Sequence, residues 1–145
     1  MKLRRPWDEL AGCMWLARFF DKARLHLAGK LGPDFEPFFG HKLATDGTFF
    51  AHFELSLEEV LPAVAAANDD DDAFAAWFAQ RPASSPARIA AWNEIAYNLG
   101  KPGHLMERSY AFAKRRYYKT EDPRLDGVFA GIAWDEGYLD EMPRR

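Results

Sequence analysis

One stretch near the N-terminus, residues 7–31, combines a helical apolar pattern with a charged pair placed inside that pattern. At about 100° per residue, the helical spacing puts most apolar positions on one broad arc. This arc holds Leu10, Cys13, Leu16, Ala17, Phe20, Ala23, Leu27, Ala28 and Leu31. Asp21 and Arg24 fall inside the same arc, about 60° apart. Because burial of an ion pair costs desolvation energy, this pair must be compensated by other contacts or serve a function.

The same pattern predicts one continuous helix over residues 8–31. Asp8 is suited to the N-cap, and Pro6 precedes it. Gly32-Pro33 ends the pattern, since a proline disfavours helical geometry in the residue before it. The fold is therefore expected to be built around this long helix.

Composition and charge indicate an ordinary globular chain. The 145 residues suit one domain, 1–145, and 48% hydrophobic with 28% charged residues argues against disorder. A formal net charge of −3 does not favour nucleic-acid binding. The first ten residues lack the apolar segment of a signal peptide, and no run reaches the roughly 18 apolar residues of a membrane span. We expect a cytoplasmic protein that binds neither nucleic acid nor membrane.

The middle of the chain carries clear helix boundaries after an irregular loop over 32–45. Residues 47–55 fit a strand by alternation or a short helix capped by Asp46, and we favour the helix because a strong start signal follows it. That signal is the capping box formed by Ser56 and Glu59. The helix it starts is expected to end at Asn68, with a kink or an early end at Pro62.

The second half of the chain predicts further short helices. The acidic run 69–72 is interpreted as a helix cap, since it lacks the glycine and distal glutamate of a calcium loop. Ser85-Pro86 should begin a helix closed by Gly100. Helices are also expected over 103–119, with Tyr117 on the inner face, and from Asp122 onward. The prediction is an all-α, single-domain, irregular bundle of about six helices.

Two glycines on the last predicted helix, Gly127 and Gly131, lie four residues apart on one face. Each weakens a helix by about 1 kcal/mol relative to alanine. A close contact with a neighbouring segment would explain their presence on that face.

The candidate ligand-binding residues are Arg18, Asp21, Lys22 and Arg24. A guanidinium group matches the geometry of a carboxylate or a phosphate, so Arg24 and Arg18 could hold an anionic group with Asp21 orienting them. Alternatively, the charged cluster is structural and fixes how the helix crosses its neighbours. Both interpretations stay open from the sequence.

No pattern assigns a catalytic residue, a metal or a cofactor. The histidines lack metal-binding spacing, apart from a single His104–Glu107 pair in the reverse of the order used in di-iron bundles. The basic and aromatic run 114–119 is better explained as a helix end than as a nucleic-acid site. Cys13, the one cysteine, excludes an intrachain disulfide and fits an inert core thiol.

Aromatic residues make up 15% of the chain, more than one small core needs. Some are therefore expected to line a pocket or a subunit contact. The preferred function is a non-enzymatic binding or assembly module, with a homodimer as one form of it. The alternative is a binder of, or an enzyme acting on, a small anionic ligand held by the polar pocket of the first helix.

The segment WLARFFDKARLHLAGKLG (15–32) resembles a bacterial family known as domain of unknown function 5069. The pattern R-x-x-D-K-x-R-x-x-x-A-G carries the resemblance. Further similarity lies at FELSLEEVLPAV (53–64), Trp92-Asn93 and WDEGYL (134–139). Family members often have a glycine at the position of Glu54, so the turn after residue 53 is a place where this chain could differ from the family. The resemblance implies a compact, stand-alone bacterial domain and supplies no activity.

Overall fold

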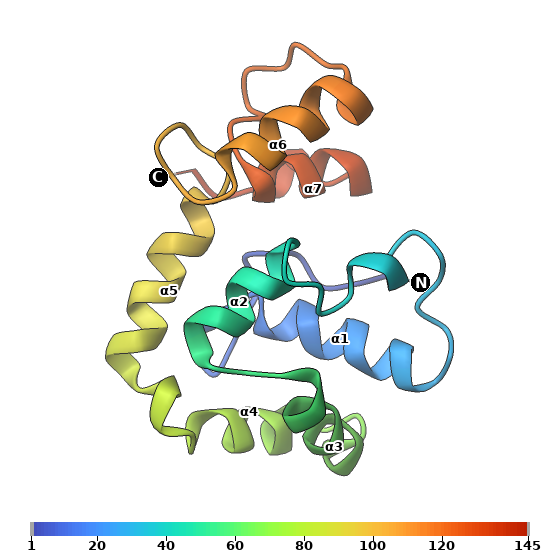
Figure 1. Cartoon of the computed structure of the whole chain (residues 1–145), viewed down its shortest axis with the longest axis vertical. Helices are drawn as coiled ribbons and strands as arrows, with labels where there is room; N and C mark the ends of the chain where they lie inside the picture. Colours follow the sequence, from blue (N-terminus) through green and yellow to red (C-terminus); the bar gives the residue numbers. More distant parts are fainter. Residues whose placement is uncertain (1, 145) are drawn as a thin grey trace.

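The computed structural model describes residues 2–144, and its regular secondary structure is helical apart from one short two-stranded sheet, which confirms the all-α prediction. Within this range the α-helices are α1 (Leu16–Leu27), α2 (Thr45–Phe53), α3 (Leu57–Ala67), α4 (Asp71–Ala79), α5 (Pro86–Asn98), α6 (Glu107–Ala113) and α7 (Val128–Glu136). The helices α1 and α2 occupy the middle of the molecule, with α3 and α4 on one side of them (Figure 1). Helix α5 runs along the edge and leads to α6 and α7 at the opposite end (Figure 1).

The predicted continuous helix over 8–31 is wrong at both ends. Its first part forms an antiparallel hairpin of β1 (Glu9–Leu10) and β2 (Cys13–Met14), with Gly12 in the left-handed region at φ 73°. Trp15, with φ 74°, separates this hairpin from α1. At the other end α1 stops at Leu27, which is 48% exposed instead of buried. The helix therefore has 12 residues, all within the predicted span.

Contacts with α5 explain why the hairpin forms instead of helix. Asn93 accepts a hydrogen bond from the backbone N–H of Met14 at 2.9 Å and donates one to the carbonyl of Gly12 at 2.9 Å. The indole N–H of Trp92 donates to the carbonyl of Met14. These two side chains satisfy backbone groups that a helix would have satisfied internally, so tertiary contacts override the helical pattern. Asp8 does not cap a helix and instead accepts hydrogen bonds from Arg5.

The short helix predicted over 47–55 is confirmed as a helix, although it spans Thr45–Phe53 and Asp46 does not cap it. The N-cap position is Ala44, and the carboxylate of Asp46 is buried against other parts of the molecule. Glu54 ends α2 in the left-handed conformation, with φ 55°. Glycine adopts this conformation readily, so the glycine expected at this position in the family would suit the turn that Glu54 makes here.

The other predicted helix boundaries in the middle of the chain are largely confirmed. Ser56 accepts the N–H of Glu59, and Asp70 and Ser85 cap α4 and α5 in the same way. Asn68 follows α3 with φ 57°. Pro62 does not shorten α3, which continues through it to Ala67.

The C-terminal part departs more from prediction. Helix α6 continues as a π-helix over Lys114–Tyr118, and this change of register leaves Tyr117 67% exposed, contrary to its predicted inner face. The last helix begins at Val128 and not near Asp122, because Asp122 folds back to accept the N–H of Arg124.

The predicted close approach at the two glycines near α7 is confirmed. A Cβ atom on Gly131 would lie 2.8 Å from the ring of Tyr118 and 2.9 Å from that of Tyr110. A Cβ atom on Gly127 would lie 2.7 Å from the carbonyl oxygen of Leu99. A larger side chain at either position would push apart the segments that pack on α7.

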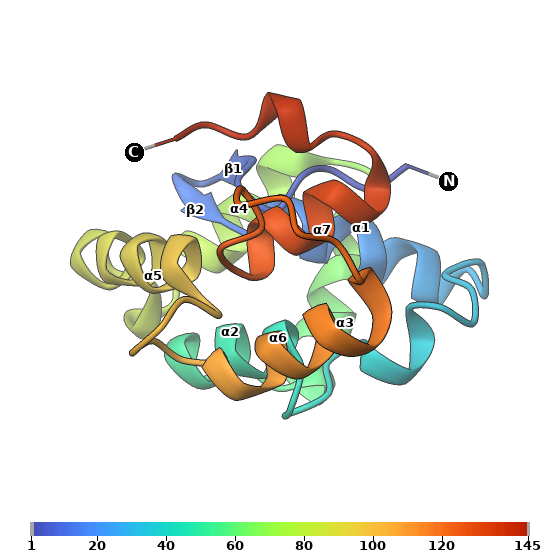
Figure 2. The same cartoon turned by 90° about the horizontal axis from the view of Figure 1, so that it is seen from above.

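The N-terminal segment packs beside the residues that follow α7, although the two ends of the chain lie on opposite sides of the view from above (Figure 2). Arg5 pairs with Glu141 at 2.9 Å, and the ring of Trp7 packs edge-on against Tyr138. The N-terminal segment is therefore part of the folded core region. Across residues 2–144, none of the helices combines the length and the apolar character needed to span a lipid bilayer.

Candidate functional site

The four candidate residues on α1 point to two different parts of the molecule. Asp21 and Arg24 do lie side by side, with the guanidinium of Arg24 2.8 Å from the carboxylate of Asp21. Asp21 also accepts the backbone N–H of Arg4 and pairs with its guanidinium, which reaches on to Asp71 of α4. This network joins the N-terminal segment, α1 and α4.

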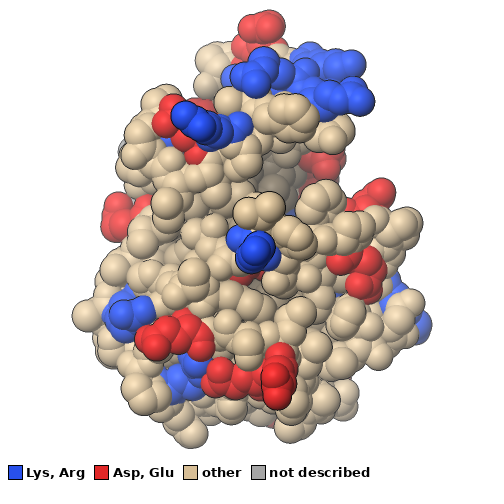
Figure 3. Space-filling view, viewed as in Figure 1, with Lys and Arg blue, Asp and Glu red and all other residues tan. Residues whose placement is uncertain are grey.

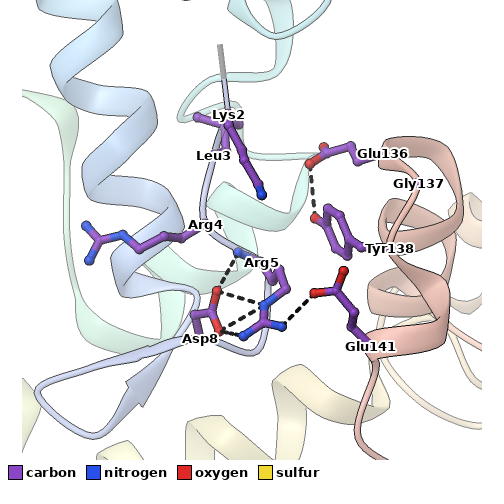
Figure 4. Close-up of a pocket in the computed structure, with 9 residues that line it drawn as sticks. All are labelled: Lys2, Leu3, Arg4, Arg5, Asp8, Glu136, Gly137, Tyr138 and Glu141. Carbon is purple, nitrogen blue, oxygen red and sulfur yellow. Dashed lines mark hydrogen bonds and ion pairs between the residues drawn. The ribbon is translucent and has the colours of Figure 1, made fainter.

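A hollow of about 530 Å³ lies between the N-terminal segment and the C-terminal residues (Figure 4). In it Arg5 bridges Asp8 and Glu141, while the side chain of Arg4 points away toward Asp21 (Figure 4). Glu136 accepts the hydroxyl of Tyr138 at 3.0 Å. Of the charged side chains that line this hollow, all but Lys2 have an ion-pair partner among residues 2–144, so the hollow offers few free charges to a ligand.

Arg18 and Lys22 contribute to a second cleft of about 380 Å³, which opens between α1 and α2 on one side and α6 and α7 on the other. In the space-filling view a hollow separates the end of the molecule that holds α6 and α7 from the rest (Figure 3). The cleft is lined by Trp15, Arg18, Lys22, Asp34, Phe35, Phe38, Leu43, Ala44, Thr45, Asp46, Met106, Ser109, Tyr110, Ala113, Tyr117, Tyr118, Val128, Ile132, Asp135 and Glu136. Neither Asp21 nor Arg24 lines it. Its size is within the range of sites for small organic ligands, about 300–1,000 Å³.

One buried ion pair in the cleft joins α1 to α2. Lys22 donates to the carboxylate of Asp46 at 2.7 Å, and the same carboxylate accepts the indole N–H of Trp15 and the backbone N–H of Gly40. Burial lowers the pKa of Lys22, while the charge of Asp46 opposes that decrease. The ammonium group also lies 4.7 Å from the ring centroid of Trp15. The carboxylate of Asp46 thus joins α1 and the loop at Gly40 to the start of α2.

A second buried ion pair joins α1 to α7. The guanidinium of Arg18, 3% exposed, lies 2.5 Å from the carboxylate of Glu136 and donates to the carbonyl of Arg4 and the hydroxyl of Tyr138. Its Nε atom is buried and has no hydrogen-bond partner. The side chain is therefore held rigidly with one N–H left unused.

A second unused polar group on the cleft is the hydroxyl of Tyr110. The residue is 7% exposed, and its oxygen is buried with no hydrogen-bond partner. Burial, with the nearby Tyr118 and Asp126, raises the pKa of Tyr110, so its hydroxyl stays protonated at neutral pH. Because an unsatisfied buried polar group costs about 1–3 kcal/mol, it is a feature that requires a reason.

Sequence reasoning identified Arg18 and Lys22 but missed Trp15, Asp46, Tyr110 and Glu136. Glu136 belongs to the WDEGYL segment, whose pattern indicates only the family resemblance. The position of Asp46 suggests a helix cap, and no local signal marks Tyr110, whose spacing is that of any buried helical residue. The Trp92-Asn93 pair is structural, since it anchors the hairpin.

The described residues offer little for metal or thiol chemistry. Within 2–144, no three His, Cys, Asp or Glu side chains come together as metal ligands could. Cys13 is fully buried, and burial raises the pKa of its thiol, so it remains a protonated core residue, as predicted.

Comparison with known proteins identifies the family of the chain. No curated protein gave a significant match. A family model, described as "Domain of unknown function (DUF5069)", matches residues 1–138, nearly the whole chain. Because the match covers far more than half of the sequence, the chain belongs to the DUF5069 family, as its motifs suggested.

Proposed function

We propose that this domain is a binding module for a small organic molecule, which lies in the cleft between α1 and α7. The molecule carries an oxygen acceptor, such as a carboxylate, that binds to donors of the protein. Four buried side-chain polar atoms among the described residues lack a hydrogen-bond partner, and two of them, Arg18 Nε and the Tyr110 hydroxyl, belong to residues that line one cleft. This observation carries the proposal. Both of these groups can donate to a ligand oxygen.

The surroundings of these two groups support binding of such a molecule. The guanidinium of Arg18 is already fixed by Glu136 and Tyr138, so little side-chain freedom is lost when a ligand binds. An ammonium group has three N–H donors, and Lys22 uses one of them on Asp46. Apolar walls surround these donors. The sequence-based expectation of an anionic ligand is thus retained for Arg18 and Lys22, whereas Asp21 and Arg24 act as support outside the cleft.

Filling the cleft should abolish binding without removing any polar group. Ala113 is half-buried and lines the cleft, so the indole of Ala113→Trp should occupy the ligand's space. In a thermal-shift and NMR screen of small carboxylates, we expect hits for the wild type that disappear in this variant. Tyr110→Phe should weaken the same hits about tenfold, the size of a hydrogen bond to a charged group.

Two control variants should keep the hits. Ala66→Trp adds the same side chain to an exposed position on α3, and Arg24→Gln alters the charged pair that lies outside the cleft. Hits that survive Ala113→Trp, or that are lost equally in Arg24→Gln, would show that the ligand binds elsewhere.

Self-association is a second candidate, favoured by exposed apolar side chains around the cleft mouth. Phe38, Leu43 and Tyr117 line the cleft and are 62%, 75% and 67% exposed, and Phe112 packs against Tyr117. If a second copy covers this surface, light scattering should give a dimer mass for the wild type and a monomer mass for Leu43→Ser. A monomer at all concentrations would exclude this candidate and leave the small-molecule proposal intact.

A further inference from the structure

Three acidic side chains from distant parts of the chain line the same cleft, and two of these residues are exposed. Asp34 lies in the loop after α1, and Asp135 and Glu136 lie at the end of α7. Glu136 is bound to Arg18 and Tyr138. Asp34 and Asp135, in contrast, have no hydrogen-bond or ion-pair partner for their carboxylates among residues 2–144.

The neighbours of Asp135 disfavour a lone negative charge there. Partial burial raises the pKa of Asp135, and the charges of Glu136 and Asp34 raise it further. A positive group at this place would relieve the repulsion among the three carboxylates.

The charged side chains that line the cleft also give it a net negative charge. The two cations that line it, Arg18 and Lys22, are each neutralised by a bound carboxylate, Glu136 and Asp46. Asp34 and Asp135 therefore leave the cleft with an excess of negative charge. Two carboxylates without partners among the described residues suit the single positive charge of an organic ammonium group.

Aromatic rings stand beside these carboxylates. Phe35 and Phe38 line the same cleft, and neither ring has an aromatic or cationic partner among the described residues. An ammonium group is attracted to the face of such a ring, and carboxylates nearby add to that attraction. Deeper in, Ile132 and Val128 offer an apolar wall.

Taking the proposed function as given, we propose that the ligand is a zwitterion: a small molecule with a protonated amine as well as a carboxylate, about the size of an aromatic amino acid. The carboxylate binds at Arg18 and Tyr110, and the ammonium, which sits on the adjoining carbon of an amino acid, binds beside it toward Asp34 and Asp135. The two binding positions adjoin each other because Asp135 precedes Glu136, the partner of Arg18. The apolar body of the molecule lies along Phe35 and Ile132.

Three related probes test this assignment by calorimetry and ligand-observed NMR. L-Phenylalanine carries both charges, 3-phenylpropionate carries only the carboxylate, and 2-phenylethylamine carries only the ammonium. We expect L-phenylalanine to bind about tenfold more tightly than either of the others, since each loses one charge-assisted contact.

The double variant Asp34→Asn/Asp135→Asn should remove the gain in affinity that the amine gives L-phenylalanine over 3-phenylpropionate. In it L-phenylalanine and 3-phenylpropionate should bind with equal affinity. The matched control Asp69→Asn/Asp140→Asn makes the same change of net charge at exposed positions outside the cleft, and should keep the tenfold difference.

The outcomes separate this inference from the proposed function. Equal binding of L-phenylalanine and 3-phenylpropionate to the wild type, or an advantage that persists in Asp34→Asn/Asp135→Asn, would overturn the zwitterion while leaving the cleft as a binding site. If none of the three probes binds but the carboxylate screen yields hits sensitive to Ala113→Trp, the zwitterion is wrong and the proposed function stands. If no ligand in either experiment depends on the cleft, both fail.

Discussion

Asp46→Asn is expected to lower the free energy of unfolding by about 3–5 kcal/mol, the usual cost of removing one partner of a buried ion pair. Asp46 is 1% exposed, and its carboxylate accepts hydrogen bonds from Lys22, Trp15 and Gly40. The amide of asparagine keeps the shape but removes the charge. Lys22, already buried enough to have a lowered pKa, would then have no counter-ion. Chemical denaturation at neutral pH measures the loss.

Two comparisons identify the unpaired charge as the cause. Lys22→Met/Asp46→Asn removes the stranded ammonium group and should be more stable than Asp46→Asn alone. Asp140→Asn makes the same chemical change in an exposed pair with Arg124, where the carboxylate is 91% exposed, and should cost no more than about 1 kcal/mol. If Asp46→Asn costs as little as Asp140→Asn, or if the double variant is the less stable of the two, the ion pair is not what holds α1 to α2.

The sequence was informative wherever a local contact decides the structure. Ser56, Asp70 and Ser85 cap the helices that follow them because their oxygens accept N–H groups only two or three residues away. Asn68, which follows α3 with a positive φ, is also a local feature. Such contacts depend on a few consecutive residues, so spacing alone reveals them.

The prediction from sequence failed where side chains far away in the sequence determine the local structure. Residues 9–14 match a helical apolar pattern, yet Asn93 and Trp92 bind their backbone as a hairpin. Nothing near residue 9 signals a partner about 80 residues later. The shortening of the helix still leaves all four candidate residues on α1, because they lie within 16–27.

The candidate site shows the same division. The helical wheel placed Asp21 beside Arg24 correctly, since those two residues share a helix. It could not show that Arg18 pairs with Glu136 or Lys22 with Asp46, because these partners lie on other helices. As a result the four residues looked like one cluster, whereas the fold divides them between an ion-pair network with Arg4 and the cleft.

Phe49→Ala is expected to lower the free energy of unfolding by about 3–5 kcal/mol, because a fully buried aromatic ring is replaced by a cavity. Phe49 lies at the centre of the aromatic core, with its ring centroid 5.3 Å from those of Phe53 and Trp92. It also contacts Phe19 of α1 and Phe78 of α4, so one side chain of α2 joins three neighbouring helices. Its removal should loosen all three at once.

Two further variants test whether the loss of stability depends on the volume removed and on the burial of the ring. Phe49→Leu keeps most of the volume and should cost less than about 1.5 kcal/mol, while Phe112→Ala removes a ring that is 53% exposed and should change stability by no more than about 0.5 kcal/mol. Denaturation midpoints for the three variants should therefore fall in the order Phe49→Ala, Phe49→Leu, Phe112→Ala, from lowest to highest. A Phe49→Ala protein as stable as Phe112→Ala would mean that the surplus of phenylalanine serves a surface and not the core. The expected order would instead assign Phe49 to the core that supports α2. Because Asp46 also lies on α2, the same core would hold Asp46 in its position in the cleft.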